Sequence, residues 1–373
     1  NSVKIDADKT EFVGYTDFDC DAKILAIVNN DGELVDMLGA GESGTVVLDK
    51  TPFYAQSGGQ VGDSGVIKNG EDNAFIVADT AKNADTIYLH KGEVSRGIIS
   101  VGDSVFASIN GERRKSIMRT HTAAHLLQAA LRQVLGTHVE QAGQLVNETE
   151  VRFDFTHFNP MTAREIAEVE MLVNKFILSA SPVTMQEMPI EEAKKSGATA
   201  LFDEKYGDTV RVVTMGDVSK EFCAGCHVEN TAQIGLCKII SEESIGSDSR
   251  RITAKTKFAA YEDFASEHAM LENIADSAKQ KGIKNIDTKV EAAYKTMHDM
   301  QKEIDNLKNQ IFTLKSKEWA TEAKDFGKVN VLIKSVSGMD AGALKDIVSN
   351  LKANDDKMVV FFVNTNGEKV VFV

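Results

Sequence analysis

Two short segments of the sequence carry side chains that can bind a metal ion. His121 and His125 stand four residues apart in "RTHTAAHLL" (119–127), and two cysteines and a histidine are packed into "CAGCHVENT" (223–231). Residues four apart project from the same face of a helix, so both imidazoles can reach one ion. Thiolates and imidazoles are the usual ligands of tetrahedral zinc. The two segments together predict a zinc site.

The second segment offers more donors than a tetrahedral site needs. Cys223, Cys226 and His227 compete for the two places that the histidine pair leaves. Gly225 lets the loop turn tightly enough for two of these side chains to converge. Cysteines in C-x-x-C spacing are the commoner pair. Chemistry alone leaves the choice between Cys226 and His227 open.

The histidine pair lacks the pattern of a zinc peptidase. In H-E-x-x-H enzymes a glutamate follows the first histidine and acts as the general base. Thr122 occupies that position here, and no carboxylate lies between the two histidines. The sequence therefore disfavours peptidase chemistry of this kind.

A helix and a turn must bring these ligands together, and the chain predicts both. Residues 1–108 contain short runs rich in β-branched residues between turn signals, which is typical of a small β-barrel or sandwich. From about residue 112, apolar residues recur at helical spacing as far as Gly136, a C-cap candidate. Strand and helix patterns then alternate. We expect a small β-barrel domain over 1–108 and an α+β zinc-binding domain over 109–257.

The remaining chain predicts long helices followed by a small sheet. Residues 258–327 carry few helix breakers, and apolar residues between 297 and 314 recur with the spacing of a heptad seam. An antiparallel hairpin turning near Gly282 and a dimeric coiled coil both fit this pattern. Residues 328–373 read strand, helix, strand, strand, a partial α/β domain. The expected fold class is α+β throughout.

Composition and charge narrow the class of protein. The chain has 373 residues, 42% hydrophobic and 26% charged, a balance typical of folded soluble domains. No apolar run is long enough to span a membrane, and four cysteines are too few for a disulfide scaffold, so we expect a cytoplasmic protein. The chain begins without Met and ends inside a predicted strand, so we expect a piece of a longer protein. A net charge of −14 limits nucleic-acid contacts to local basic clusters at 112–119 and 249–257.

Several segments together resemble the alanyl-tRNA synthetases, without their aminoacylation domain. The resemblance runs over nearly the whole chain and rests on "TEFVGYTDF" (10–18), "YAQSGGQ" (54–60), the HxxxH segment, the CxxxH segment and "SRRITAKT" (249–256). In that family the HxxxH and CxxxH motifs hold zinc. The resemblance therefore implies the ligands His121, His125, Cys223 and His227, and leaves Cys226 as an extra thiol.

The resemblance also implies a reaction and its substrate. An apolar alanine pocket discriminates poorly against glycine and serine, by roughly 10²-fold, so a second site removes the wrong amino acid. The reaction implied is hydrolysis of the ester of Ser-tRNA(Ala) or Gly-tRNA(Ala). Gln60 is the expected catalytic residue that reads the serine hydroxyl, because an amide offers a donor and an acceptor. Arg119, Arg250 and Arg251 are expected to meet the tRNA(Ala) acceptor end. Four protein ligands favour zinc as an organiser of the site.

Some positions depart from the family pattern, and other functions stay open. Gln56, Gln144, Cys226 and the segment "GSDSRRI" (246–252) differ from it, all within or near the family's editing pocket. One alternative is a zinc-structured module that binds tRNA and associates, without turnover. A free-standing trans-editing deacylase is the other. A homodimer through the C-terminal helical region is a separate expectation about partners.

Overall fold

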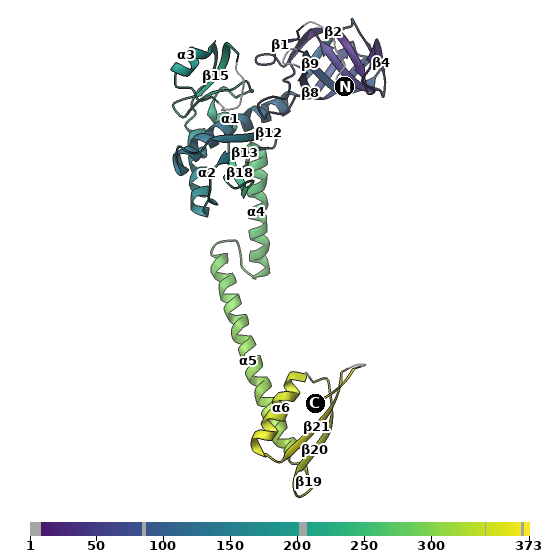
Figure 1. Ribbon diagram of the computed structural model, residues 1–373, viewed down its shortest axis with the longest axis vertical. Coiled ribbons are helices and arrows are strands. Elements are labelled where there is room, and N and C mark those ends of the chain that lie inside the picture. Colours follow the sequence, from purple (N-terminus) through teal and green to yellow (C-terminus); the bar gives the residue numbers. More distant parts are fainter. Residues whose placement is uncertain (1–8, 84–86, 201–206, 340, 367–368) are drawn as a thin grey trace. The chain divides into compact units, whose positions relative to one another are not determined.

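The computed structural model describes residues 9–83, 87–200, 207–339, 341–366 and 369–373 (Figure 1). Its internal contacts divide the chain into two compact units, residues 1–266 and 267–373. The domain boundaries expected at 108, 257 and 327 stay predictions. Within the described residues, no helix combines the length and the apolar character needed to cross a bilayer.

The first unit begins with a closed barrel of six antiparallel strands. Around the barrel they are β2 (Asp19–Asn29), β5 (Ser43–Leu48), β9 (Ile87–Arg96), β8 (Asn73–Asn83), β7 (Gly65–Asn69) and β11 (Ser104–Ile109). Strand β11 pairs with both β7 and β2, which closes the sheet on itself. Inward-facing residues such as Ile27, Val46 and Phe75 are fully buried and fill the interior. This confirms the predicted small barrel.

Short strands complete the barrel region. Strand β3 (Leu34–Val35) extends the sheet beyond β2, β4 (Met37–Gly39) pairs with β10 (Ile98–Ser100), and β1 (Glu11–Phe12) pairs in parallel with β6 (Lys50–Thr51). Between β6 and β7 the chain leaves the sheet in the loop that contains Gln60.

A long helix carries the chain from the barrel into the rest of the first unit. Helix α1 (Gly111–Leu135) starts after Asn110, whose side chain accepts a hydrogen bond from the backbone of Arg113. It ends at Gly136, at a φ of 119°, which confirms the predicted C-cap. Helix α2 (Ala163–Leu178) begins with a capping box at Thr162 and packs against α1.

Two antiparallel sheets surround α1. One has the order β12 (Gln141–Val146), β13 (Glu150–Thr156), β18 (Ser249–Thr256) and β17 (Cys237–Ser244). The other is β14 (Val183–Pro189), β15 (Thr209–Met215) and β16 (Ser219–Phe222), with α3 (Ile190–Lys195) between β14 and β15 and η1 (Thr231–Ile234) after β16. Together these elements confirm the expected α+β fold of this region.

The second unit is built on a long helix and a small sheet. Helix α4 (Lys257–Ser277) begins in the first unit and ends in the second, and α5 (Ile286–Ala320) follows past Gly282. The sheet order is β19 (Lys324–Asp325), β20 (Asn330–Ser337), β21 (Met358–Asn366) and β22 (Lys369–Phe372), and α6 (Ala341–Asn354) connects the parallel pair β20 and β21. Trp319, Leu332 and Phe362 form the centre of its core. The predicted long helices and the strand–helix–strand–strand pattern are confirmed.

Candidate metal centre

The four residues expected as metal ligands lie together in the first unit. His121 and His125 lie on consecutive turns of α1, on its buried face, and are only 1% and 7% exposed. Their rings stack with centroids 5.4 Å apart. Cys223 and His227 come from the loop that follows β16. The Cys223 Sγ lies 3.5 Å from His121 Nε2 and 3.3 Å from His227 Nε2. One ligand atom from each of the four lies within 4.8 Å of the others.

The loop can approach α1 this closely because position 225 has no side chain. A Cβ built on Gly225 would overlap the imidazole ring of His121 and lie 3.0 Å from Gln60 Oε1. Cys226 is buried, but it does not belong to the group of four ligand atoms. Its backbone N–H donates instead to Gln60 Oε1 at 2.9 Å.

Each of the three imidazoles is oriented through its Nδ1. The Nδ1 of His121 is 2.8 Å from Gln60 Oε1, that of His125 is 2.8 Å from Glu221 Oε2, and that of His227 is 3.2 Å from Thr122 Oγ1. Partners of this kind fix the tautomer and direct the other nitrogen toward a metal. The Nε2 of His125 is buried and finds no hydrogen-bond partner in the described part of the chain, which suits a nitrogen that binds a metal ion.

The electrostatics of the cluster favour a thiolate. Burial raises the pKa of Cys223, but the adjacent His121, His227 and His125 outweigh it and hold the pKa well below its usual range. Burial lowers the pKa of His227 to about 3, against the opposing effect of Cys223. Burial also lowers the pKa of His125, but Glu221 and Cys223 raise it to about 10. A thiolate and a neutral imidazole are the forms that bind metal ions, so Cys223 and His227 already have the required form, whereas His125 must release a proton when an ion binds.

A small cavity opens beside the cluster. Its volume is about 40 Å³, and its walls include His121, His125 and Cys223. The barrel contributes Tyr54, Ser57 and Gly58, β12 contributes Gln141 and Gln144, and Glu221, Phe222, Ala224 and Gly225 complete the lining. Gln144 Nε2 donates to the carbonyl of Gly58 at 2.7 Å. A space of this size accepts only a few heavy atoms.

Gln60 lies behind His121, outside the cavity lining. Its side chain is fully buried, and its Oε1 is already occupied by His121 Nδ1 and the Cys226 backbone. Its Nε2 is buried without an acceptor among the described residues. The observed contacts make Gln60 a support for the histidine. Its expected role toward a substrate hydroxyl stays a prediction.

The three arginines expected at the tRNA lie in different surroundings. Arg119 Nε donates to the backbone carbonyl of Gln233 at 2.9 Å, and its side chain lines a separate pocket of about 610 Å³. Arg250 forms a two-pronged ion pair with Glu242, and Arg251 forms one with Asp154 at 2.7 and 2.8 Å. Both pairs span neighbouring strands. Neither Arg250 nor Arg251 is therefore a free cation, and a phosphate would have to displace a carboxylate.

Glu221 and Thr122 are site residues that the sequence reasoning missed. Glu221 accepts from Ser219 Oγ at 2.8 Å as well as contacting His125, and Thr122 contacts His227. Glu221 stands only two residues before Cys223, so a carboxylate close to a predicted ligand was the available signal. For Thr122, its place between the two histidines gives no sequence signal for a contact with His227.

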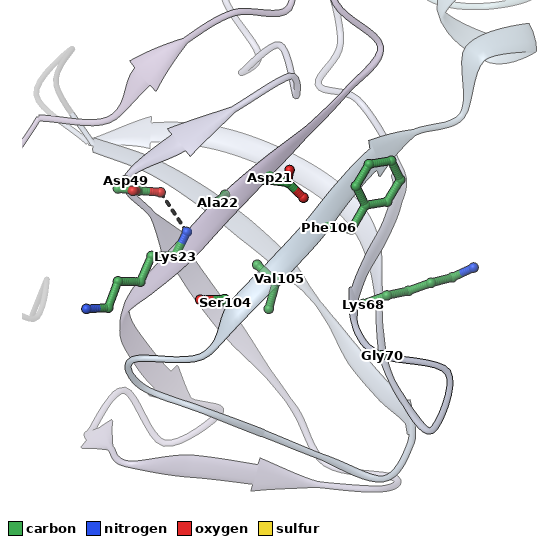
Figure 2. A pocket seen from close by; sticks show the side chains of 9 residues that line it. All are labelled: Asp21, Ala22, Lys23, Asp49, Lys68, Gly70, Ser104, Val105 and Phe106. Carbon is green, nitrogen blue, oxygen red and sulfur yellow. Dashed lines mark hydrogen bonds between the residues drawn. The ribbon is translucent and has the colours of Figure 1, made fainter.

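A larger pocket lies on the outer wall of the barrel (Figure 2). Its volume is about 630 Å³, and Asp21, Lys23, Asp49 and Lys68 place opposite charges around it. The exposed ring of Phe106 forms part of its wall. The pocket is larger than the cavity at the cluster, but none of the predicted site residues lines it.

The sequence matches two known domain families in part and several known proteins along nearly its whole length. Residues 1–113 match the class II (A) tRNA synthetases, and residues 210–253 match the second additional domain of threonyl and alanyl tRNA synthetases. The alanine–tRNA ligase of Bacillus velezensis is 41% identical over 362 residues, covering 97% of this chain and 41% of that protein. That of Acetivibrio thermocellus is 42% identical over 365 residues, covering 98% and 41%.

These matches relate residues 1–113 and residues 210–253 to two domain families of tRNA synthetases. The chain is a homologue of the alanine–tRNA ligases along nearly its whole length. It spans about two fifths of the length of the curated relatives that it matches.

Proposed function

We propose that this chain carries the editing site of an alanine–tRNA ligase and hydrolyses Ser-tRNA(Ala) and Gly-tRNA(Ala) at a zinc-containing centre. The observation that carries the proposal is the convergence of four donor atoms, from segments about a hundred residues apart, beside a small cavity. The match of residues 210–253 to the second additional domain supports it.

The donor set fits zinc. Three imidazoles and one thiolate are four donors of the kinds that zinc binds, and outer partners hold the imidazoles. When bound, zinc supplies a fixed positive charge that orients the amino-acid end of the substrate. The chain's own residues shape the cavity, which admits a small aminoacyl group and limits larger ones. Water then adds to the ester carbonyl, the bond to the 3′ oxygen of the tRNA breaks, and a free amino acid and tRNA result.

Recognition of serine over alanine requires a polar contact with the hydroxyl, because apolar walls separate such similar groups weakly. The Nε2 of Gln60, which has no acceptor among the described residues, is the donor that we propose for this contact. This role requires the buried Gln60 side chain to turn toward the cavity, because it does not line the cavity in the structure. Arg119, Arg250 and Arg251 stay proposals for the tRNA acceptor end. For Arg250 and Arg251 this role requires exchange of Glu242 or Asp154 for a phosphate.

The decisive test is hydrolysis of serine-charged and glycine-charged tRNA(Ala) by the purified chain, with alanine-charged tRNA(Ala) as the control. Zinc is counted on the same sample. We expect about one zinc per chain and release of serine or glycine well above release of alanine. Equal release of all three amino acids, or no release, would contradict the proposal.

Ligand variants test the centre itself. We expect His125→Ala and Cys223→Ala to lose bound zinc and hydrolysis together, because each removes one of four donors. His138→Ala and Cys20→Ala are matched controls outside the cluster and should keep both. Stoichiometric zinc in both ligand variants would refute the assignment.

A tRNA-binding module without turnover is a second candidate. The observation that favours it is the complete set of four protein ligands, because closed zinc sites are usually structural. Under this alternative the chain holds zinc and binds tRNA with a linear fall of log affinity against log salt. It releases no amino acid.

A further inference from the structure

Two side chains hold the backbone of the loop that carries Cys223 and His227. This segment, residues 223–227, is called the ligand loop below. Tyr15 Oη donates to the carbonyl oxygen of Ala224 at 2.7 Å. Arg211 Nη1 donates to the carbonyls of Cys223 at 3.1 Å and Gly225 at 2.6 Å. Three consecutive carbonyls of the ligand loop are therefore fixed by only two residues.

The two side chains also support each other. The guanidinium carbon of Arg211 lies 4.1 Å from the ring centroid of Tyr15, a cation–π contact. The ring of Phe12 also contacts Tyr15, in an edge-to-face arrangement with the ring centroids 4.9 Å apart. Burial raises the pKa of the Tyr15 phenol above its usual value even with Arg211 nearby, so the hydroxyl remains a donor.

The two residues reach the ligand loop from separate parts of the chain. Tyr15 follows β1 in the barrel region and lies 209 positions before its partner Ala224, whereas Arg211 belongs to β15. The ligand loop has no helix or strand of its own to define its shape. Its two ligands must nevertheless meet those of α1 within a few ångströms, so its backbone needs external support.

From this geometry we propose that Tyr15 and Arg211 are positioning residues for the ligand loop. They act on the metal through the loop backbone, because their polar atoms contact the carbonyls of residues 223–225. The segment after β1 that contains Tyr15 would thus form part of the metal centre. This inference rests on the metal site in the proposed function.

The test compares metal binding by Tyr15→Phe and Arg211→Met with wild type. Tyr15→Phe keeps the ring over Arg211 and removes one carbonyl bond, and Arg211→Met removes two. We expect zinc affinity, measured by chelator competition, to fall by about tenfold or more, the range found for outer partners of metal ligands. Cobalt-loaded variants should show shifted thiolate and d–d absorption bands, because the ligand geometry relaxes. Arg211→Lys, which retains a donor, should recover part of the affinity.

Matched controls are Tyr261→Phe, an exposed tyrosine of α4, and Arg152→Met, an exposed arginine of β13. Both should bind zinc and cobalt like wild type. The inference would be overturned if Tyr15→Phe and Arg211→Met showed the same zinc affinity and cobalt spectrum as these controls.

A second measurement separates this inference from the proposed function. Amide hydrogen exchange over residues 224–228 is followed in the metal-free chain. Faster exchange in Tyr15→Phe and Arg211→Met than in the controls supports the positioning role of Tyr15 and Arg211, even if wild type fails to hydrolyse mischarged tRNA. If wild type binds no metal, the proposed metal centre is wrong. If exchange in the two variants also equals that in the controls, the positioning role is overturned as well.

Discussion

At the scale of single residues, the close approach of the ligand loop to α1 depends on Gly225. An added methyl group there would overlap the His121 ring, which Gln60 holds at Nδ1. We therefore predict that Gly225→Ala displaces either the ring or the loop and lowers zinc affinity by at least tenfold. Zinc content after dialysis against a weak chelator measures this. Gly246→Ala, whose added methyl would meet its nearest atom at 3.8 Å, should keep full zinc. Full occupancy in Gly225→Ala would contradict the geometry.

Cys226 tests which donors the loop provides. Its thiol does not belong to the group of four, and its backbone N–H makes the bond to Gln60. We predict that Cys226→Thr keeps one zinc per chain, because the substitution retains that backbone bond. Metal analysis and the cobalt spectrum check this. Loss of the metal, or of one thiolate-to-cobalt band, would make Cys226 a ligand instead.

At the scale of elements, a buried histidine ties three segments of the barrel together. His90 on β9 donates from Nδ1 to the carbonyl of Val46 at 2.9 Å and accepts at Nε2 from Thr51 Oγ1 at 2.7 Å. Burial lowers its pKa to about 4, against the opposing bond to Val46. The folded state therefore holds His90 neutral. The unfolded chain binds a proton near pH 6.5.

This difference makes barrel stability depend on pH. The contribution of His90 is complete above about pH 6.5 and is lost as the pH falls toward 4, because the unfolded state then takes up the proton first. We predict that protonation of His90 in the unfolded chain lowers the free energy of unfolding by about 2 kcal/mol as the pH falls from 7 to 5. Urea unfolding of the barrel at both pH values measures it. His90→Gln should show a smaller pH dependence, whereas exposed His268→Gln should behave like wild type. Equal pH dependence in all three would contradict the assignment.

At the scale of the whole molecule, α5 carries an exposed apolar seam. Its members are each at least 43% exposed in the described chain: Met297, Met300, Ile304, Leu307, Ile311 and Leu314. Their heptad spacing suits a partner helix. Association through this seam stays a prediction. If the chain dimerises through it, Ile304→Lys with Leu307→Lys should give a monomer in sedimentation equilibrium, and zinc removal should not. Glu303→Lys with Asn306→Lys, off the seam, should leave the mass unchanged, and a dimer in the seam variant would exclude this interface.

The sequence by itself determined most of the elements and the chemical types at the centre. Spacing of four on a helix placed His121 and His125 on one face, and β-branched runs between turns predicted the barrel. These signals are local, because helix and strand periodicity depends on near neighbours along the chain. The missed strand β18 shows the limit. It lies in "SRRITAKT", where the basic residues suggested only a charged cluster.

Tertiary structure alone decided the partners of these residues. It placed His227 beside the other ligands and Cys226 outside the group, turned Gln60 toward His121, and paired Arg250 and Arg251 with carboxylates of neighbouring strands. It also brought Glu221 to His125, 96 positions away. The physical reason is that buried polar groups take whichever partner packing brings within hydrogen-bond distance. Sequence spacing cannot fix that choice when the partner comes from another element.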